Sequence, residues 1–92
     1  MPLGLVLRRW FATREHWRRP EFDRCEELNE ALARLGVTEL DANERSVCAY
    51  GRNEAGVHWL GREPLRGTDT YPLLAALERL GAKVAARAEA AG

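Results

Sequence analysis

The central part of the chain, residues 44–64, reads ERSVCAYGRNEAGVHWLGREP. It holds two runs in which residues of different character alternate: Val47, Cys48, Ala49 and Tyr50 in the first run, and Val57, His58, Trp59 and Leu60 in the second. Alternation with a period of two is typical of a β-strand with two different faces. The residues between the runs, GRNEAG, favour a tight turn because glycine and asparagine accept turn conformations. The stretch therefore predicts a β-hairpin.

A helix is predicted directly before the hairpin, over residues 20–36, PEFDRCEELNEALARLG. Its apolar residues recur at spacings of three and four and share one helical face: Phe22, Cys25, Leu28, Leu32 and Leu35. Pro20 suits the first turn of a helix, and Gly36 is a natural terminator. Four polar residues are expected to lie mostly away from the apolar face: Arg24, Glu27, Asn29 and Glu30.

A second helix is predicted after the hairpin, over residues 68–81, TDTYPLLAALERLG. Its apolar stripe consists of Leu73, Leu74, Leu77 and Leu80. Pro72 fits the first turn, and Gly81 is expected to end the helix. The following residues 82–87, AKVAAR, are interpreted as a short strand, with a continued helix as the alternative.

The amino-terminal residues 3–11, LGLVLRRWF, allow two interpretations. Alternating leucines favour a strand, whereas a helix over 3–18 would also place its leucines and tryptophans on one side. With the strand, the order is βαββαβ, a ferredoxin-like arrangement in which two helices cover one face of an antiparallel sheet. With the helix, the order is ααββα. Both orders predict a small two-layer α+β domain over residues 1–92.

Composition narrows the class of protein further. The 92 residues are 46% hydrophobic and 30% charged, which is typical of a folded domain and not of a disordered chain. No apolar run approaches the ~18 residues of a membrane-spanning helix, and the start lacks a signal-peptide pattern. We therefore expect a cytoplasmic protein without a membrane partner. Cys25 and Cys48 belong to no CxxC pair, and both are expected to be free thiols.

Charge is unevenly distributed, although the formal net charge is zero. Residues 1–20 carry a net +4, residues 21–45 a net −5 and residues 46–92 a net +1. Separated basic and acidic regions can steer a partner or can pair with each other within one chain or between two copies.

The segment 7–20, LRRWFATREHWRRP, suggests one possible partner. Its arginines have the chemistry to contact phosphates, and its aromatic rings have the chemistry to stack on bases. The candidate nucleic-acid contacts are Arg8, Arg9, Arg14, Trp17, Arg18 and Arg19. A neutral chain and an adjacent acidic helix argue against this function, since dedicated nucleic-acid binders are usually basic. Nucleic-acid binding is therefore an alternative hypothesis.

Sequence motifs for catalysis are absent. The chain has no GxGxxG, no Walker motif and no GxSxG, and Ser46 is its only serine. His16, His58 and the two cysteines lack the close pairs that zinc sites generally show. The sequence predicts no catalytic residue, no metal and no cofactor, and it favours a protein that is not an enzyme.

The leading hypothesis is a small non-catalytic protein-interaction or regulatory module. A sheet face that no helix covers would expose apolar surface to water, and a homodimer that forms through this face would bury that surface. Tryptophan and arginine often anchor such interfaces, and the candidate residues are Trp10, Tyr50, Arg52 and Trp59. An immunity or antitoxin-type binding protein belongs to this class. A small-molecule sensor or small enzyme with a pocket between sheet and helices is a further alternative.

Overall fold

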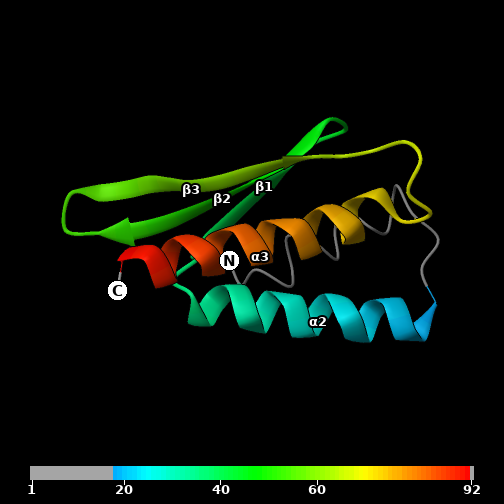
Figure 1. Cartoon of the computed structure of the whole chain (residues 1–92), viewed down its shortest axis with the longest axis horizontal. Coiled ribbons are helices and arrows are strands. Elements are labelled where there is room, and N and C mark those ends of the chain that lie inside the picture. Colours follow the sequence, from blue (N-terminus) through cyan, green and yellow to red (C-terminus); the bar gives the residue numbers. More distant parts are fainter. Residues whose placement is uncertain (1–17, 92) are drawn as a thin grey trace.

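The structure is a computed structural model, and it describes residues 18–91. Its elements are α2 (Arg19–Arg34), β1 (Glu39–Ala42), β2 (Ser46–Asn53), β3 (Gly56–Pro64) and α3 (Pro72–Ala91). The strands form one antiparallel sheet in the order β1-β2-β3. Both helices lie on the same side of this sheet (Figure 1). The predicted α+β class is therefore confirmed.

The order of elements differs from the ferredoxin-like prediction. The described residues run helix, three strands, helix, and residues 82–87 continue α3 instead of forming a strand. Gly81 does not end the helix, because Val84 follows Leu80 at helical spacing and is buried at 4% exposure. The alanine-rich end also has high helix propensity. The predicted strand over 3–11 and, apart from Arg18, the alternative helix over 3–18 lie outside the described residues.

Strand β1 was not predicted from the sequence. Its four residues, ELDA, include no β-branched or aromatic residue, so they carry little strand propensity. The strand forms because Leu40 reaches the core at 5% exposure while Glu39 to Ala42 pair with Tyr50 to Val47 of β2. A long-range pairing therefore defines this strand, and local pattern alone does not.

The predicted hairpin is confirmed as β2 and β3. Asn53 lies opposite Gly56, and the turn between them is closed by Asn53 Oδ1, which accepts a hydrogen bond from the Ala55 N–H at 2.9 Å. The register shifts at a bulge: Ala49 pairs with Gly61, whereas Tyr50 pairs with Trp59. Leu60 is the extra residue, and a bulge of this kind bends and twists the strand locally.

Helix α3 is the centre of the packing, since it contacts β2, β3 and α2. Gly61 permits its close approach to β3, because a Cβ there would lie 3.2 Å from Leu80 Cδ1. Among the described hydrophobic residues, seven have no measurable exposure: Leu32, Val47, Ala49, Leu73, Ala76, Leu77 and Leu80. The predicted apolar stripe of the second helix therefore forms the core.

The predicted polar face of α2 needs one correction. Asn29 is buried, although it was expected to lie away from the apolar stripe. Its Nδ2 donates hydrogen bonds to the Cys25 carbonyl at 2.8 Å and to Cys25 Sγ at 3.3 Å, one turn earlier in the helix. These local partners satisfy the Nδ2 donor, whereas Oδ1 is buried without a hydrogen-bond partner among the described residues. Phe22, expected on the apolar face, is 39% exposed.

Candidate interaction surface

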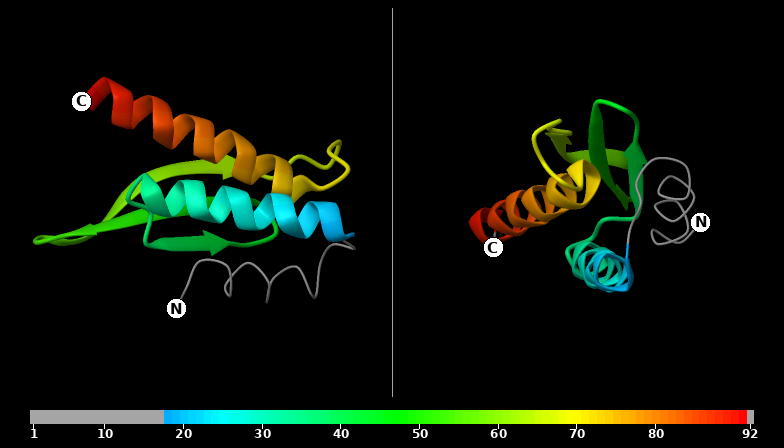
Figure 2. Two further views of the ribbon diagram at one scale, coloured as in Figure 1. Left: turned by 90° about the horizontal axis from the view of Figure 1, so that it is seen from below. Right: turned by 90° about the vertical axis from the view of Figure 1, so that its right-hand side faces the viewer.

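The two faces of the sheet differ in what covers them. Because side chains alternate along a strand, the strand register assigns each residue to a face. The face toward the helices, here the covered face, includes Leu40, Val47, Ala49, Gly61 and Glu63. The opposite side, here the open face, includes Glu39, Asp41, Cys48, Tyr50, Arg52, Val57, Trp59 and Arg62. In the part of the chain that the structure describes, neither helix packs on the open face (Figure 2).

Three of the four predicted interaction residues meet on the open face. Tyr50 lies directly opposite Trp59, and Arg52 lies opposite Val57 in the next row of the same face. The alternation seen in the sequence is the signal that placed them together. Trp10, the fourth residue, lies outside the described residues.

The hairpin half of the open face carries exposed apolar surface. Trp59 is 52% exposed and Val57 is 49% exposed, and both belong to the same side of β3. Tyr50 is partly buried beside them. Single exposed apolar residues are ordinary, but adjacent large ones on one sheet face are typical of a binding surface.

Charges on the open face are segregated by strand. β1 contributes the carboxylates of Glu39 and Asp41, whereas β3 contributes Arg62. Between them, Arg52 Nη2 lies 3.5 Å from Glu39 Oε1 in an exposed ion pair. The open face therefore has an acidic edge at β1 and a basic edge at β3.

The acidic side of this face also affects Tyr50. The pKa of the Tyr50 phenol is raised above its ordinary value, first because the Cys48 thiolate would repel a phenolate beside it. Partial desolvation and the carboxylates of Asp41 and Glu39 act in the same direction. The Tyr50 hydroxyl therefore stays protonated, and a hydrogen-bond donor, to a higher pH than that of an ordinary tyrosine.

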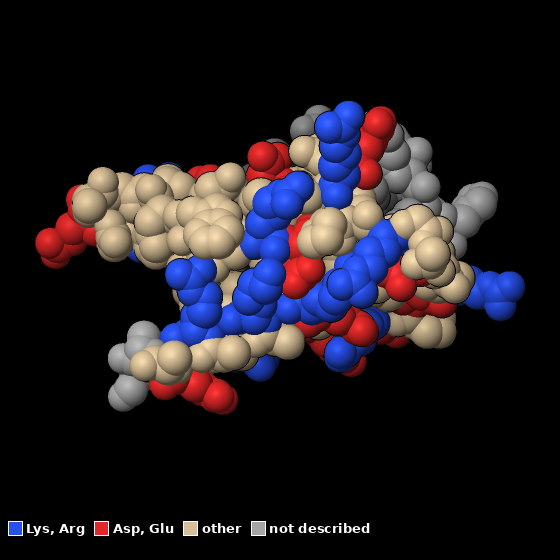
Figure 3. All heavy atoms as spheres, turned by 45° about the horizontal axis from the view of Figure 1, so that its top comes forward, with Lys and Arg blue, Asp and Glu red and all other residues tan. Residues whose placement is uncertain are grey.

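The outer edge of β3 is covered by basic side chains of α3. Arg79 donates to the Pro64 carbonyl at 3.0 Å, Lys83 to the Arg62 carbonyl at 3.1 Å, and Arg87 to the Leu60 carbonyl at 2.8 Å. The donors are spaced four residues apart, so they follow one face of the helix. Figure 3 shows lysine and arginine side chains gathered across the middle of the surface, next to an uncharged area over the hairpin end.

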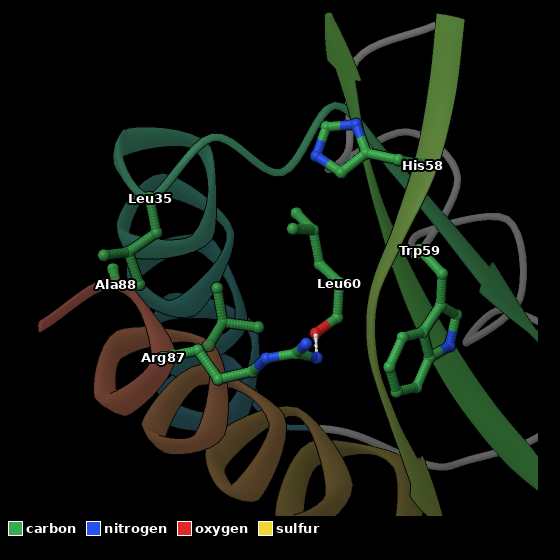
Figure 4. A pocket seen from close by; sticks show the side chains of 7 residues that line it. Leu35, His58, Trp59, Leu60, Arg87 and Ala88 are labelled. Atoms are coloured by element: carbon green, nitrogen blue, oxygen red, sulfur yellow. Dashed lines mark hydrogen bonds between the residues drawn. The ribbon is translucent and has the colours of Figure 1, made fainter. Parts of the chain in front are cut away.

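A pocket lies where α3, the hairpin and the end of α2 meet. It has a volume of about 340 Å³ and is lined by Leu35, His58, Trp59, Leu60, Val84, Arg87 and Ala88. His58 and Leu60 point to the helix side of β3, whereas Trp59 lies on the other side of the strand (Figure 4). The Arg87 guanidinium carbon is 5.3 Å from the centre of the Trp59 ring, a distance typical of a cation–π contact.

The predicted nucleic-acid segment is described only at its end. Arg18 and Arg19 are exposed at the start of α2, and Arg19 Nε lies 3.5 Å from an Asp23 carboxylate oxygen. The start of α2 lies at the opposite end of the molecule from the turn between β2 and β3 (Figures 1 and 2). The other candidates, Arg8, Arg9, Arg14 and Trp17, lie outside the described residues. Nucleic-acid binding through this segment stays a prediction.

Among residues 18–91, no group of three or more His, Cys, Asp or Glu side chains is placed to hold a metal ion. Cys25 is buried and Cys48 is partly exposed, and neither forms a disulfide. The helices described by the structure are too short or too polar to cross a membrane.

Sequence reasoning missed the basic row on α3. Arg79, Lys83 and Arg87 recur every four residues, which is a visible helical spacing, but the prediction of a strand over 82–87 interrupted it.

Comparison of the chain with protein-family models, curated proteins and solved structures finds no match in any of the three.

Proposed function

We propose that this chain is a small interaction module that self-associates through the open face of its sheet. The observation that carries the proposal is the exposure of Trp59 and Val57, at 52% and 49%, on one face beside Tyr50. A second copy would remove this apolar surface from water, which is favourable in proportion to the area buried.

The charge pattern supports a second copy as the occupant. Asp41, Cys48 and Arg62 form one row across the three strands. If two open faces pack about a two-fold axis parallel to the strands, the β1 edge of one copy lies over the β3 edge of the other. Asp41 of each copy then lies opposite Arg62 of its partner, so the face is self-complementary in charge.

Face-to-face packing is favoured over pairing of sheet edges. The outward carbonyls of Leu60, Arg62 and Pro64 already accept hydrogen bonds from α3. Pro64 also has no N–H to donate. The other edge strand, β1, is only four residues long, and a short edge strand offers little surface for strand addition.

Sedimentation equilibrium of the full chain, combined with thiol labelling, tests this proposal. Cys48 lies in the centre of the proposed interface, whereas Cys25 is buried in the core. We expect a monomer–dimer equilibrium, and we expect the reaction of Cys48 with a soluble disulfide reagent to slow as protein concentration rises. A Cys48→Ser variant supplies the background rate of Cys25. A monomer at all concentrations, or a Cys48 rate independent of concentration, would contradict self-association through this face.

A further inference from the structure

The pocket beside Arg87 combines an apolar wall with polar groups on its rim. Leu35, Leu60, Val84 and Ala88 supply the aliphatic surface, from three separate parts of the chain. His58 and Arg87 supply the polar groups (Figure 4). Ligand pockets in proteins commonly combine apolar lining with a few oriented polar groups in this way.

Arg87 differs from the other two members of the basic row in its charge balance. Lys83 Nζ lies 3.1 Å from Glu63, and Arg79 lies 3.6 Å from Glu63 and 3.2 Å from Asp69. Arg87 has no described carboxylate within ion-pair distance. The basic row is therefore neutralised at one end and keeps an uncompensated positive charge at the end that borders the pocket.

Arg87 is held in place while retaining donors for a ligand. Its Nη1 donates to the Leu60 carbonyl at 2.8 Å, and its guanidinium stacks against Trp59. A guanidinium has five N–H donors in a fixed planar arrangement, so most of them remain for a further acceptor. Because the group is already ordered by the strand, less side-chain entropy is lost when a ligand binds.

His58 is positioned at the rim by a glycine on the neighbouring strand. A Cβ at Gly51 would lie 2.9 Å from His58 Cε1 and 3.1 Å from the Gly36 carbonyl oxygen. Only glycine leaves room for the imidazole to lie over β2 at this point. The ring therefore lies beside the apolar wall and offers a further hydrogen-bonding group.

We propose that this pocket binds a small organic anion with an apolar body, of the alkyl carboxylate class. The carboxylate would pair with the Arg87 guanidinium, which suits planar, two-point recognition of a carboxylate. The alkyl chain would lie against Leu60, Val84 and Leu35. The volume of about 340 Å³ is at the lower end of the range for ligand pockets, which fits a small ligand.

Octanoate is the probe, and amide chemical shifts of the full-length protein are the readout. We expect saturable shifts at Leu60, Val84 and Ala88. The Arg87→Gln variant should bind octanoate about tenfold more weakly, since it loses the charged partner. Arg66→Gln is the matched control, because it removes an exposed arginine that lies neither in the pocket nor on the open face. Neutral octanol should bind the wild type more weakly than octanoate and should be insensitive to Arg87→Gln.

Other results would overturn the proposal. No saturable shift with octanoate excludes a site for this class. Equal octanoate affinity in wild type and Arg87→Gln would contradict the role of the arginine. Equal weakening by Arg66→Gln would indicate a general charge effect instead of a specific site. Ala88→Phe, which places a ring on the pocket wall at an exposed helix position, must also abolish the shifts. Sedimentation equilibrium with and without octanoate measures self-association separately. Failure of the pocket proposal can therefore be told apart from failure of the self-association proposal.

Discussion

The covered and open faces of the sheet place valines in opposite environments within one hairpin. Val47 on β2 is completely buried against the helices, whereas Val57 on β3 is 49% exposed on the other side. On β2 and β3, packing against α3 covers Val47, Ala49 and Gly61, which therefore contribute to folding. Trp59 and Val57 lie outside the core at 52% and 49% exposure, and we propose that they contact a second copy. The two sides of the same strands therefore differ in burial, and under this proposal one side stabilises the fold while the other binds.

The largest effect should come from shortening a valine on the covered face. We expect Val47→Ala to lower the free energy of unfolding by about 2–3 kcal/mol, through lost burial and a cavity. Val57→Ala, the same change on the open face, should alter it by less than about 0.5 kcal/mol. Urea denaturation at a concentration where the protein is monomeric measures both. Similar losses for the two variants would remove the distinction between the faces.

Glu63 tests the polar part of the covered face. Its side chain is only 11% exposed and lies between Arg79 and Lys83. Glu63→Gln should destabilise the fold by about 1–2 kcal/mol, because two cations lose their carboxylate and both retain some access to water. Glu39→Gln is the matched control on the open face, where an exposed ion pair contributes about 0–1 kcal/mol. Equal stability changes in thermal unfolding would contradict this difference.

Trp59 tests whether the open face binds instead of stabilising the fold. We expect Trp59→Ser to raise the dissociation constant of the dimer at least about tenfold, since buried tryptophans commonly dominate interfaces. Its unfolding midpoint as a monomer should stay close to that of the wild type. Phe22→Ser changes an exposed aromatic residue of α2 outside this face. Sedimentation equilibrium should show loss of association only for the Trp59 variant; an equal loss in both would place the interface elsewhere.

The smallest effect concerns the ionisation of Tyr50. Its pKa lies above the ordinary value of 10.0, and the nearby Cys48 thiolate is the largest cause. Cys48→Ala should lower the phenol midpoint toward the ordinary value, because the repelling charge is removed. This midpoint is measured from the ultraviolet absorbance of phenolate as a function of pH. The Tyr50→Phe variant gives the contribution of Tyr71, which is subtracted. If Cys48→Ala leaves the titration midpoint of Tyr50 unchanged, the Cys48 thiolate does not influence the ionisation of Tyr50.

The sequence predicts the parts of the fold that depend on local periodicity. The hairpin and both helices carry their pattern within a short window, so alternation and helical spacing identify them. Strand β1 could not be found in this way, since its existence depends on pairing with β2. For residues 82–87 the continued helix was the alternative to the preferred strand. It forms because a glycine is a weak helix breaker when the following turn packs in the core, as Val84 does.

The candidate surface was partly predictable for the same reason. Alternation along the strands places Tyr50, Arg52 and Trp59 on one face without knowledge of the tertiary structure. The role of Arg87 is different, because it depends on how α3 runs beside β3 and on which cations meet Glu63. Such contacts between distant segments have no signal in a local sequence pattern.

Exchange of the charges of Asp41 and Arg62 tests self-association most directly. Asp41→Arg alone places like charges opposite each other across the proposed two-fold axis, and so does Arg62→Asp alone; each should weaken the dimer about tenfold or more. The double variant restores opposite charges between the copies, and sedimentation equilibrium should return its dissociation constant to within about threefold of the wild type. A double variant as weak as, or weaker than, the single variants would contradict face-to-face packing.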